Sequence, residues 1–483
     1  MKRTLPIFLA NLLLSILVSS CGTSGYWIPP YSTPTVLPGL AFLAETAAPE
    51  PTDPPVQPQP SATPSQDPPA AFTPTAAANP ATEPPLILKP SSTPSIASVN
   101  TAPILYYTQA ADSLPVVAVR FGVTLTEITS PDPIPQKAFI NPGQLLIIPR
   151  RLANTTSSKH LLPDSEVVFS PSAIDFDVAA YAKQAGGRLS GEQDWLKGTG
   201  IIPGTSLLLR VATENSINPR LLLALMEYQT QWLTSRDQDR NQVDYPIGLV
   251  DPSQQGLYRQ LVWAVNELSI GYYAYREGRL TEINFPDGMT ARLAPDLNAG
   301  TAALQYFFAQ LYQGQRWLDA LDPVNGFPAL YTRMFGDPWA RAQTVEPLYP
   351  PDLTQPPLVL PFARNWQWSF TGGPHGAWEY EGAYAALDFA PGSSESGCVK
   401  SDAWEVAAAS GLVVRSDSGV VVIDLDGDGH EQTGWVLMYL HVAEEGQIAA
   451  NTWVDAGTPI GHPSCEGGIS TGTHLHIARK YNG

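Results

Sequence analysis

Six of the chain's seven histidines lie in its last quarter, and four of these stand in an order that could place them around one metal ion. The residues concerned are His375, Asp388, His441, His474 and His476. Zinc takes imidazole and carboxylate ligands in tetrahedral geometry, and a catalytic zinc keeps one position open for water, so three protein ligands are expected. His375, Asp388 and His476 supply a set of that kind.

The segments around these residues have the composition of strands. Residues 473–480 alternate between polar and apolar, and residues 384–389 and 436–441 are short apolar runs typical of buried strands. Side chains two positions apart share one face of a strand, so His474 and His476 are predicted to lie side by side, one binding metal and the other touching the reacting group. Three such strands predict a sheet with an active site on its face.

The motifs that carry these residues resemble a known family. They are Gly-Gly-Pro-His-Gly ending at Gly376, Leu-Asp-Phe-Ala around Asp388, and Gly-Thr-His-Leu-His-Ile ending at Ile477. They resemble the lysostaphin-type (M23) zinc endopeptidases of bacterial cell walls, in the β-lytic and staphylolysin branch. Tyr384 stands where most of that superfamily has its first histidine, and the longer spacing from His375 to Asp388 is similar to that of the β-lytic branch.

The resemblance implies a function for each of the five residues. His375, Asp388 and His476 would bind one zinc ion, and His441 and His474 would be the catalytic pair that polarises the water and stabilises the oxyanion. It also implies a mainly antiparallel β peptidase domain over residues 362–483. Its substrate would be peptidoglycan, cleaved in the stem peptide or the cross-bridge.

Two other classes of function stay open. A non-catalytic wall-binding lipoprotein that scaffolds or activates other hydrolases would keep the fold without turnover. A glycan-cleaving enzyme would act through the helical middle of the chain and release sugar ends in place of amino groups.

The N-terminus is predicted to direct export. Residues 1–20 combine a basic start with a short apolar run, as in a signal peptide, and the segment ending at Cys21 resembles a bacterial lipoprotein cleavage box. Lipidation of Cys21 would anchor the protein to the outer face of the cell membrane. The alternative is a signal peptide with an incidental cysteine. Outside the cytosol, the remaining Cys398 and Cys465 are expected to form a disulfide, or else are both free and buried.

A long proline-rich segment follows the signal peptide. Residues 29–103 hold 20 of the chain's 48 prolines and few charges, so the segment cannot bury a core. Residues 21–103 are therefore predicted to be a disordered tether between the membrane and the rest of the chain.

Residues 104–150 are predicted to form a small βααβ domain. The pattern gives a strand near Tyr106, a helix over residues 114–121, the start of a second helix at residues 124–128, and a strand over residues 145–148. It resembles a LysM module, which implies binding to glycan that contains N-acetylglucosamine. The alternative is a degenerate spacer domain.

Residues 165–345 are predicted to be a mostly α domain, and residues 346–361 a proline-rich linker. The segment 217–232 resembles the catalytic-helix region of lysozyme-like transglycosylases. However, Gln229 stands where that family has its catalytic Glu, and Glu227 points about 200° away around the helix. A non-catalytic lysozyme-like domain and a structural helical spacer are both left open.

Two further features bear on ligands. Asp424, Asp426 and Asp428 resemble the first half of a calcium loop, but Trp435 occupies the position of its bidentate Glu, so a hairpin turn is favoured over Ca²⁺. The chain carries 45 acidic and 27 basic side chains, for a net charge of −18, with no basic patch that contains interleaved aromatics. Nucleic acid is therefore not an expected partner.

Overall fold

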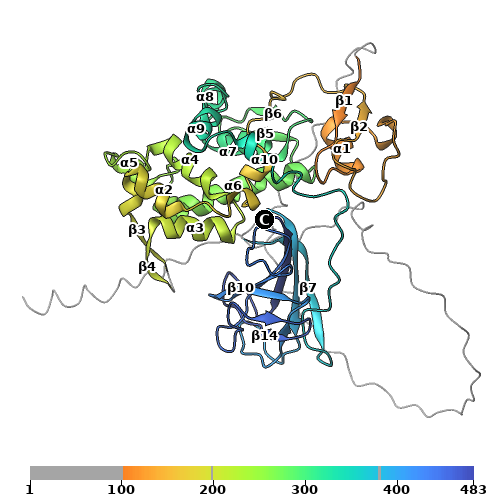
Figure 1. Ribbon diagram of the computed structural model, residues 1–483, viewed down its shortest axis with the longest axis vertical. Helices are drawn as coiled ribbons and strands as arrows, with labels where there is room; N and C mark the ends of the chain where they lie inside the picture. Colours follow the sequence, from red (N-terminus) through yellow and green to blue (C-terminus); the bar gives the residue numbers. More distant parts are fainter. Residues whose placement is uncertain (1–101, 197–198, 379–381) are drawn as a thin grey trace, which may run out of the picture. The chain divides into compact units, whose positions relative to one another are not determined.

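The computed structural model describes residues 102–483, except residues 197–198 and 379–381 (Figure 1). The predicted signal peptide, Cys21 and nearly all of the predicted tether lie outside the described residues. The described chain contains a small α/β region, a helical region and a C-terminal antiparallel sheet. No helix in this part of the chain is long and apolar enough to cross a membrane.

The small α/β region contains one helix packed on a two-stranded antiparallel sheet. Strand β1 (Ile104–Tyr107) pairs antiparallel with β2 (Leu145–Ile148), and α1 (Leu114–Phe121) buries its apolar face on them. The predicted second helix is wrong, because the chain makes only the 3-10 turn η1 (Leu125–Glu127). Three prolines between residues 131 and 135 prevent a helix there, since each lacks a backbone donor and restricts the residue before it.

The helical region confirms the prediction of a helical middle. Its helices are α2 (Val178–Ala185), α3 (Gly204–Glu214), α4 (Pro219–Thr230), α5 (Arg240–Asp244), α6 (Leu257–Arg276), α7 (Ala299–Leu311), α8 (Gly314–Ala320), α9 (Phe327–Phe335) and α10 (Pro338–Ala342). Its 3-10 turns are η2 (Asp164–Glu166), η3 (Pro171–Ala173), η4 (Arg188–Gly191) and η5 (Pro252–Gln254). Two small hairpins join β3 (Gln193–Leu196) to β4 (Gly200–Pro203) and β5 (Glu282–Asn284) to β6 (Thr290–Arg292). One continuous apolar core links these elements.

Two polar side chains of helix α4 form hydrogen bonds within the helical region. Glu227 is buried, and its carboxylate accepts hydrogen bonds from the backbone N–H groups of Leu233 and Thr234. The Gln229 side-chain oxygen accepts a hydrogen bond from the Tyr312 hydroxyl. Both side chains therefore have structural partners, and a lysozyme-like role for this region stays a prediction.

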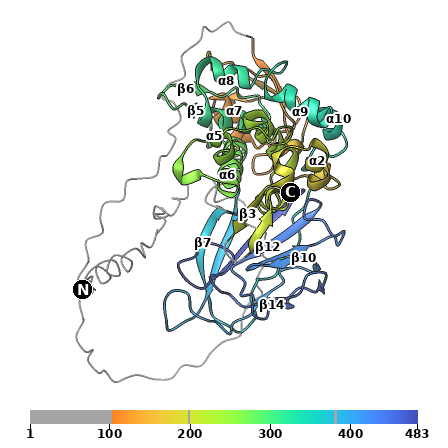
Figure 2. The same ribbon diagram turned by 90° about the vertical axis from the view of Figure 1, so that its left-hand side faces the viewer.

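The C-terminal region confirms the predicted antiparallel architecture. Its main sheet has seven strands in the order β13-β10-β11-β12-β15-β8-β7, and Figure 2 shows them in blue, with β7 at one edge. The strands are β7 (Trp368–Gly376), β8 (Tyr384–Pro391), β10 (Gly411–Asp417), β11 (Val420–Asp424), β12 (Trp435–Leu440), β13 (Trp453–Val454) and β15 (Leu475–Tyr481). A separate pair joins β9 (Glu405–Val406) to β14 (Pro459–Gly461).

Both faces of this sheet are apolar over its central strands. One face buries Val421, Ile423, Leu437 and Tyr439 in a cluster that extends to β15. The other face buries alternate residues of the same strands, together with Ala386 and Ala478. Because side chains alternate along a strand, Asp388 and His476 share this second face with those two alanines.

Glu405, on β9, is a buried acid that the fold leaves without a partner. Its side chain is fully buried, and neither carboxylate oxygen has a hydrogen-bond partner among the described residues. Burial raises the pKa of Glu405 well above its usual value. An acid with a raised folded-state pKa stays protonated while the unfolded chain ionises, so stability falls as the pH rises above about 4.5.

Glu405→Gln is therefore expected to stabilise the protein at pH 8 by about 1.4 kcal/mol or more, because each unit of pKa difference contributes that amount. The gain should shrink as the pH falls toward 4.5, because the residue then becomes increasingly protonated in the unfolded chain as well. Thermal unfolding of both proteins at the two pH values measures it. Glu395→Gln, at an exposed position, is the matched control, and equal stabilisation at both pH values would show that ionisation of Glu405 is not the cause.

Candidate metal centre

The polar residues of the site lie on, or directly next to, four neighbouring strands of the sheet. On β15, His476 lies directly opposite Asp388 of β8, and on β7, His375 lies opposite Ala386. On the other side of β15, Leu440 of β12 lies opposite His476, and His441 follows at the end of that strand. The register of the sheet therefore brings segments about 100 residues apart to one place.

Irregular pairing between β7 and β8 positions His375 beside Asp388 and His476. The β7–β8 register shifts three times, between Phe370 and Gly376, and Gly372 lies opposite Asp388. A Cβ atom on Gly372 would lie 2.6 Å from Oδ2 of Asp388 and 3.0 Å from its Cβ. Glycine is therefore required at residue 372, because any side chain would push the carboxylate out of position.

Three donor atoms form a nearly equilateral triangle. Nε2 of His375 lies 3.2 Å from Nδ1 of His476 and 3.4 Å from Oδ1 of Asp388, and Nδ1 of His476 lies 3.2 Å from the same oxygen. Oδ1 of Asp388 is buried and has no hydrogen-bond partner among the described residues. The structure thus brings together the three residues that the sequence predicts to be metal ligands.

This triangle has the dimensions of a zinc site. Two donor atoms that each lie about 2.1 Å from a tetrahedral zinc are roughly 3.4 Å apart. The two nitrogens and one oxygen are also a donor set that zinc prefers, and three protein ligands leave the fourth position for water or substrate. These residues therefore fit a zinc ion, whose protein ligands would be His375, Asp388 and His476.

Backbone carbonyls orient both ligand imidazoles. Nδ1 of His375 donates to the carbonyl of Gly373 at 2.8 Å, and Nε2 of His476 donates to the carbonyl of Ala377 at 3.1 Å. A carbonyl can only accept a hydrogen bond, so each of these nitrogens must carry the proton. The remaining nitrogen of each ring then presents a lone pair to the centre, as metal ligation requires.

The other two imidazoles lie beside this triangle and are held in the same way. Nδ1 of His441 donates to the carbonyl of Glu466 at 2.8 Å, and Nδ1 of His474 donates to the carbonyl of Gly472 at 2.8 Å. Their ring centroids are 4.5 Å apart, and Nε2 of His474 lies 3.7 Å from Oδ1 of Asp388. The Nε2 atoms of both rings are therefore available for proton transfer.

The site favours a charged carboxylate and a neutral His441. Burial raises the pKa of Asp388, but the imidazoles of His476, His375 and His474 beside its carboxylate more than offset that effect, so the net pKa is lowered. Burial, followed by the charge of His474, lowers the pKa of His441 to about 4. His441 is almost fully buried and has a φ of 69°.

A disulfide and a hydrogen-bonded pair tie two loops of the site together. Cys398 and Cys465 form a disulfide that joins the loop after β8 to the loop before β15. Thr473 accepts from the backbone N–H of Val399 and donates to its carbonyl. These links position the segment that contains His474.

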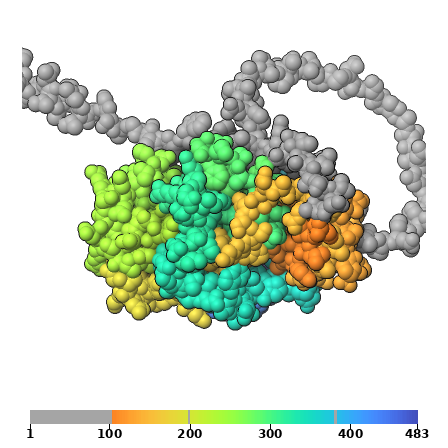
Figure 3. All heavy atoms as spheres, turned by 90° about the horizontal axis from the view of Figure 1, so that it is seen from above, coloured from red at the N-terminus to blue at the C-terminus, as the bar shows by residue number. Residues whose placement is uncertain are grey.

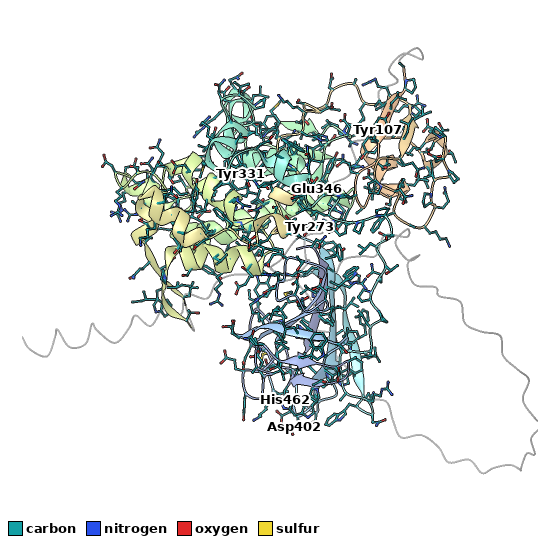
Figure 4. The ribbon with its side chains drawn as sticks, viewed as in Figure 1. Tyr107, Tyr273, Tyr331, Glu346, Asp402 and His462 are labelled. Carbon is teal, nitrogen blue, oxygen red and sulfur yellow. A yellow bond between two sulfur atoms is a disulfide. The ribbon has the colours of Figure 1, made fainter. Side chains whose placement is uncertain are left out.

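The other histidines and the acidic loop lie apart from this centre. Figure 4 shows His462 and Asp402 together at one end of the sheet, where Nδ1 of His462 donates to the carbonyl of Ala403. The carboxylates of Asp424, Asp426 and Asp428 converge, but Asp424 accepts hydrogen bonds from backbone N–H groups of its own loop. Burial and its acidic neighbours raise the pKa of Asp426 to about 6. Calcium binding here stays a prediction.

Sequence reasoning did not identify the groups that orient the rings. The four carbonyl acceptors belong to Gly373, Ala377, Glu466 and Gly472. A backbone carbonyl leaves no mark in the residue type, so no sequence signal could have found them. The role of Gly372 does have a signal, since a glycine pair next to a ligand suggests a close approach of the backbone.

Comparison with known proteins gives matches to the helical region and to somewhat more than half of the chain. Residues 160–349 match the family model of the LasA N-terminal domain. Protease LasA of Pseudomonas aeruginosa strain UCBPP-PA14 is 28% identical over 291 residues, which cover 56% of this chain and 64% of that protein. Protease LasA of strain PAO1 is 28% identical over 294 residues, with the same coverage. The chain thus spans less than two thirds of the length of these relatives.

Two solved structures are similar to part of the chain. The M23 metalloprotease pseudoalterin, from the deep sea, shares 28% identity and covers 27% of this chain and 73% of its own, with a TM-score of 0.22. The catalytic domain of the antimicrobial peptidase lysostaphin from Staphylococcus simulans shares 23% identity and covers 25% of this chain and 83% of its own, with a TM-score of 0.18.

Proposed function

We propose that this protein is a zinc-dependent endopeptidase that cleaves peptide bonds of peptidoglycan. The observation that carries the proposal is the triangle of Nε2 of His375, Oδ1 of Asp388 and Nδ1 of His476, with two further imidazoles beside it. Similarity to Protease LasA supports proteolysis as the activity. The resemblance to lysostaphin-type enzymes supports the cell wall as the substrate, at the stem peptide or the cross-bridge.

The arrangement of the residues suggests how the reaction proceeds. Zinc, when bound, polarises a peptide carbonyl and lowers the pKa of a water molecule. The Nδ1 atoms of His441 and His474 are bonded to backbone carbonyls, which leaves Nε2 of each ring for the reaction, and Nε2 of His474 lies 3.7 Å from Oδ1 of Asp388. One Nε2 takes the proton of the attacking water, and the other ring, when protonated, donates a hydrogen bond to the oxyanion that forms on the substrate carbonyl.

The remaining parts of the chain are proposed to hold the enzyme at the wall. Residues 104–150 would bind glycan as a LysM module does, and lipidated Cys21 would anchor the protein to the outer face of the cell membrane. Residues 21–103 would connect the two. These proposals rest on the sequence patterns alone.

A second candidate function is a non-catalytic wall-binding lipoprotein that scaffolds or activates other hydrolases. Purified sacculi separate the two. The endopeptidase should release new amino groups, a chelator should abolish the release, and added Zn²⁺ should restore it. A zinc-loaded protein that binds sacculi without releasing amines would be a scaffold. New reducing or anhydro sugar ends in place of amines would assign the activity to glycan cleavage.

A further inference from the structure

A cleft of about 200 Å³ lies where the small α/β region meets the helical region. Figure 3 shows this junction, where the orange residues of the α/β region lie beside amber and teal residues of the helical region. The residues that matter for its chemistry are Gln109, Asp164, Arg276, Asn298, Trp339 and Glu346. Among them, Glu346 is labelled in Figure 4.

Direct hydrogen bonds fix the two walls of the cleft to each other. Nε2 of Gln109 donates to the carbonyls of Asp296 and Leu297 at 3.3 and 3.0 Å. Nη2 of Arg292 donates to the carbonyl of Arg120 at 2.9 Å. The guanidinium of Arg120 is itself buried, 5.2 Å from the ring centroid of Tyr275 of α6. The cleft is therefore part of a packed junction.

The polar groups that line the cleft are held in place before any ligand binds. Oδ1 of Asp164 accepts hydrogen bonds from Nδ2 of Asn298 and from the backbone N–H of Gly300, both at 2.8 Å. Oε1 of Glu346 accepts one from the backbone N–H of Ser165 at 2.9 Å. An ionised carboxylate has about four lone-pair sites, and a protonated one keeps acceptor capacity and adds an O–H donor, so both acids can still form hydrogen bonds with a ligand.

Arg276 supplies hydrogen-bond donors and a positive charge to the cleft. Its Nη1 donates to the hydroxyl of Tyr272 at 2.9 Å, and its guanidinium lies 4.7 Å from the ring centroid of Tyr349. A guanidinium has five N–H donors in a fixed geometry, so further donors remain for a ligand. Arg276 is the cation that balances the acids of this cleft.

The charges of the cleft favour an uncharged ligand. Burial, followed by the charge of Asp164, raises the pKa of Glu346 and favours its neutral form. The cleft then contains one cation, Arg276, and one anion, Asp164. An anionic ligand would be repelled by Asp164 and a cationic one by Arg276, whereas hydroxyl and amide groups can pair with both.

An aromatic surface lies at the rim. Trp339 of α10 is 38% exposed, and the nearly parallel ring of His160 lies 6.3 Å from it, centroid to centroid. An exposed indole offers a flat apolar face next to polar groups, which suits a ligand that has C–H groups on one side and hydroxyls at its edge. A sugar ring has that construction.

From these features we infer that the cleft binds one N-acetylhexosamine residue of a glycan strand. The volume is below the 300–1,000 Å³ or so of sites for larger ligands, and it suits a single ring. The inference deepens the proposed function, since it rests on peptidoglycan as the substrate and adds a glycan subsite remote from the zinc centre.

Calorimetric titration of the whole protein with the β-1,4-linked tetramer of N-acetylglucosamine tests the inference. Trp339→Ala is expected to weaken binding about tenfold, through the loss of the apolar face, and Glu346→Gln to weaken it several-fold. Trp195→Ala, at an exposed tryptophan on β3, is the matched control and should bind as the unmodified protein does. Thermal unfolding of each variant checks the fold.

Three results would overturn the inference: binding that Trp339→Ala leaves unchanged, an equal loss in Trp195→Ala, or no binding of the tetramer at millimolar concentration. The proposed peptidase activity is measured separately, as the cleavage of a short stem peptide without sugar. Trp339→Ala should cleave this peptide at the unmodified rate. Peptide cleavage without Trp339-dependent sugar binding would refute the cleft alone, and the reverse result would refute the peptidase alone.

Discussion

His441→Asn is expected to keep one zinc per chain and to lose about 10²- to 10⁴-fold in the rate of peptide cleavage, the usual contribution of one acid–base group. His441 is outside the triangle of metal donors, so its loss should leave zinc binding intact. Nε2 of its ring is free for proton transfer because Nδ1 is bonded to the carbonyl of Glu466. An asparagine side chain cannot take up that proton.

Asparagine is preferred to alanine here for a structural reason. His441 has a φ of 69°, a left-handed conformation that asparagine adopts more readily than most residues. The matched control is His430→Asn, in an exposed loop, which should cleave at the unmodified rate. Zinc content by mass spectrometry and the rate of amine release are measured on both. Full activity in His441→Asn would remove this ring from the mechanism.

Gly372→Ala is expected to lower zinc affinity about 10- to 100-fold, the range seen when the groups that orient a metal ligand are disturbed. The added Cβ would lie 2.6 Å from Oδ2 of Asp388, closer than such atoms can approach, so the carboxylate must move away from its two histidine partners. Activity at limiting zinc should fall in parallel.

The neighbouring glycine provides a matched control. A Cβ on Gly373 would meet no atom within 4 Å, and its carbonyl would still accept the hydrogen bond from His375. Gly373→Ala should therefore bind zinc as the unmodified protein does. Competition with a chromogenic chelator measures the affinity of each variant. Equal affinities for the two alanine variants would show that the position of Asp388 does not depend on Gly372.

The strands that carry the site were predictable because their side-chain pattern is local. Residues 473–480 alternate, and β15 (Leu475–Tyr481) lies there; the apolar run at 384–389 corresponds to β8. The apolar residues between 411 and 424 form two strands, β10 and β11, because the chain turns at Ser418 and Gly419, both with positive φ. Pattern alone did not show that turn.

Other parts depend on contacts that residue types do not encode. The second helix predicted from residue 124 is a single 3-10 turn, since the prolines after it exclude a longer helix. The three register shifts along β7 arise from how that strand meets β8. The cleft exists only because two separately predicted regions pack together, so no single segment of the sequence indicated it.

The most direct test of the central claim is an anomalous-difference map from crystals of the zinc-loaded protein, measured at the zinc absorption edge. One strong peak is expected about 2.1 Å from Nε2 of His375, Oδ1 of Asp388 and Nδ1 of His476. Crystals of protein that is active in solution but has no peak at these three atoms, or has its zinc bound elsewhere, would contradict it.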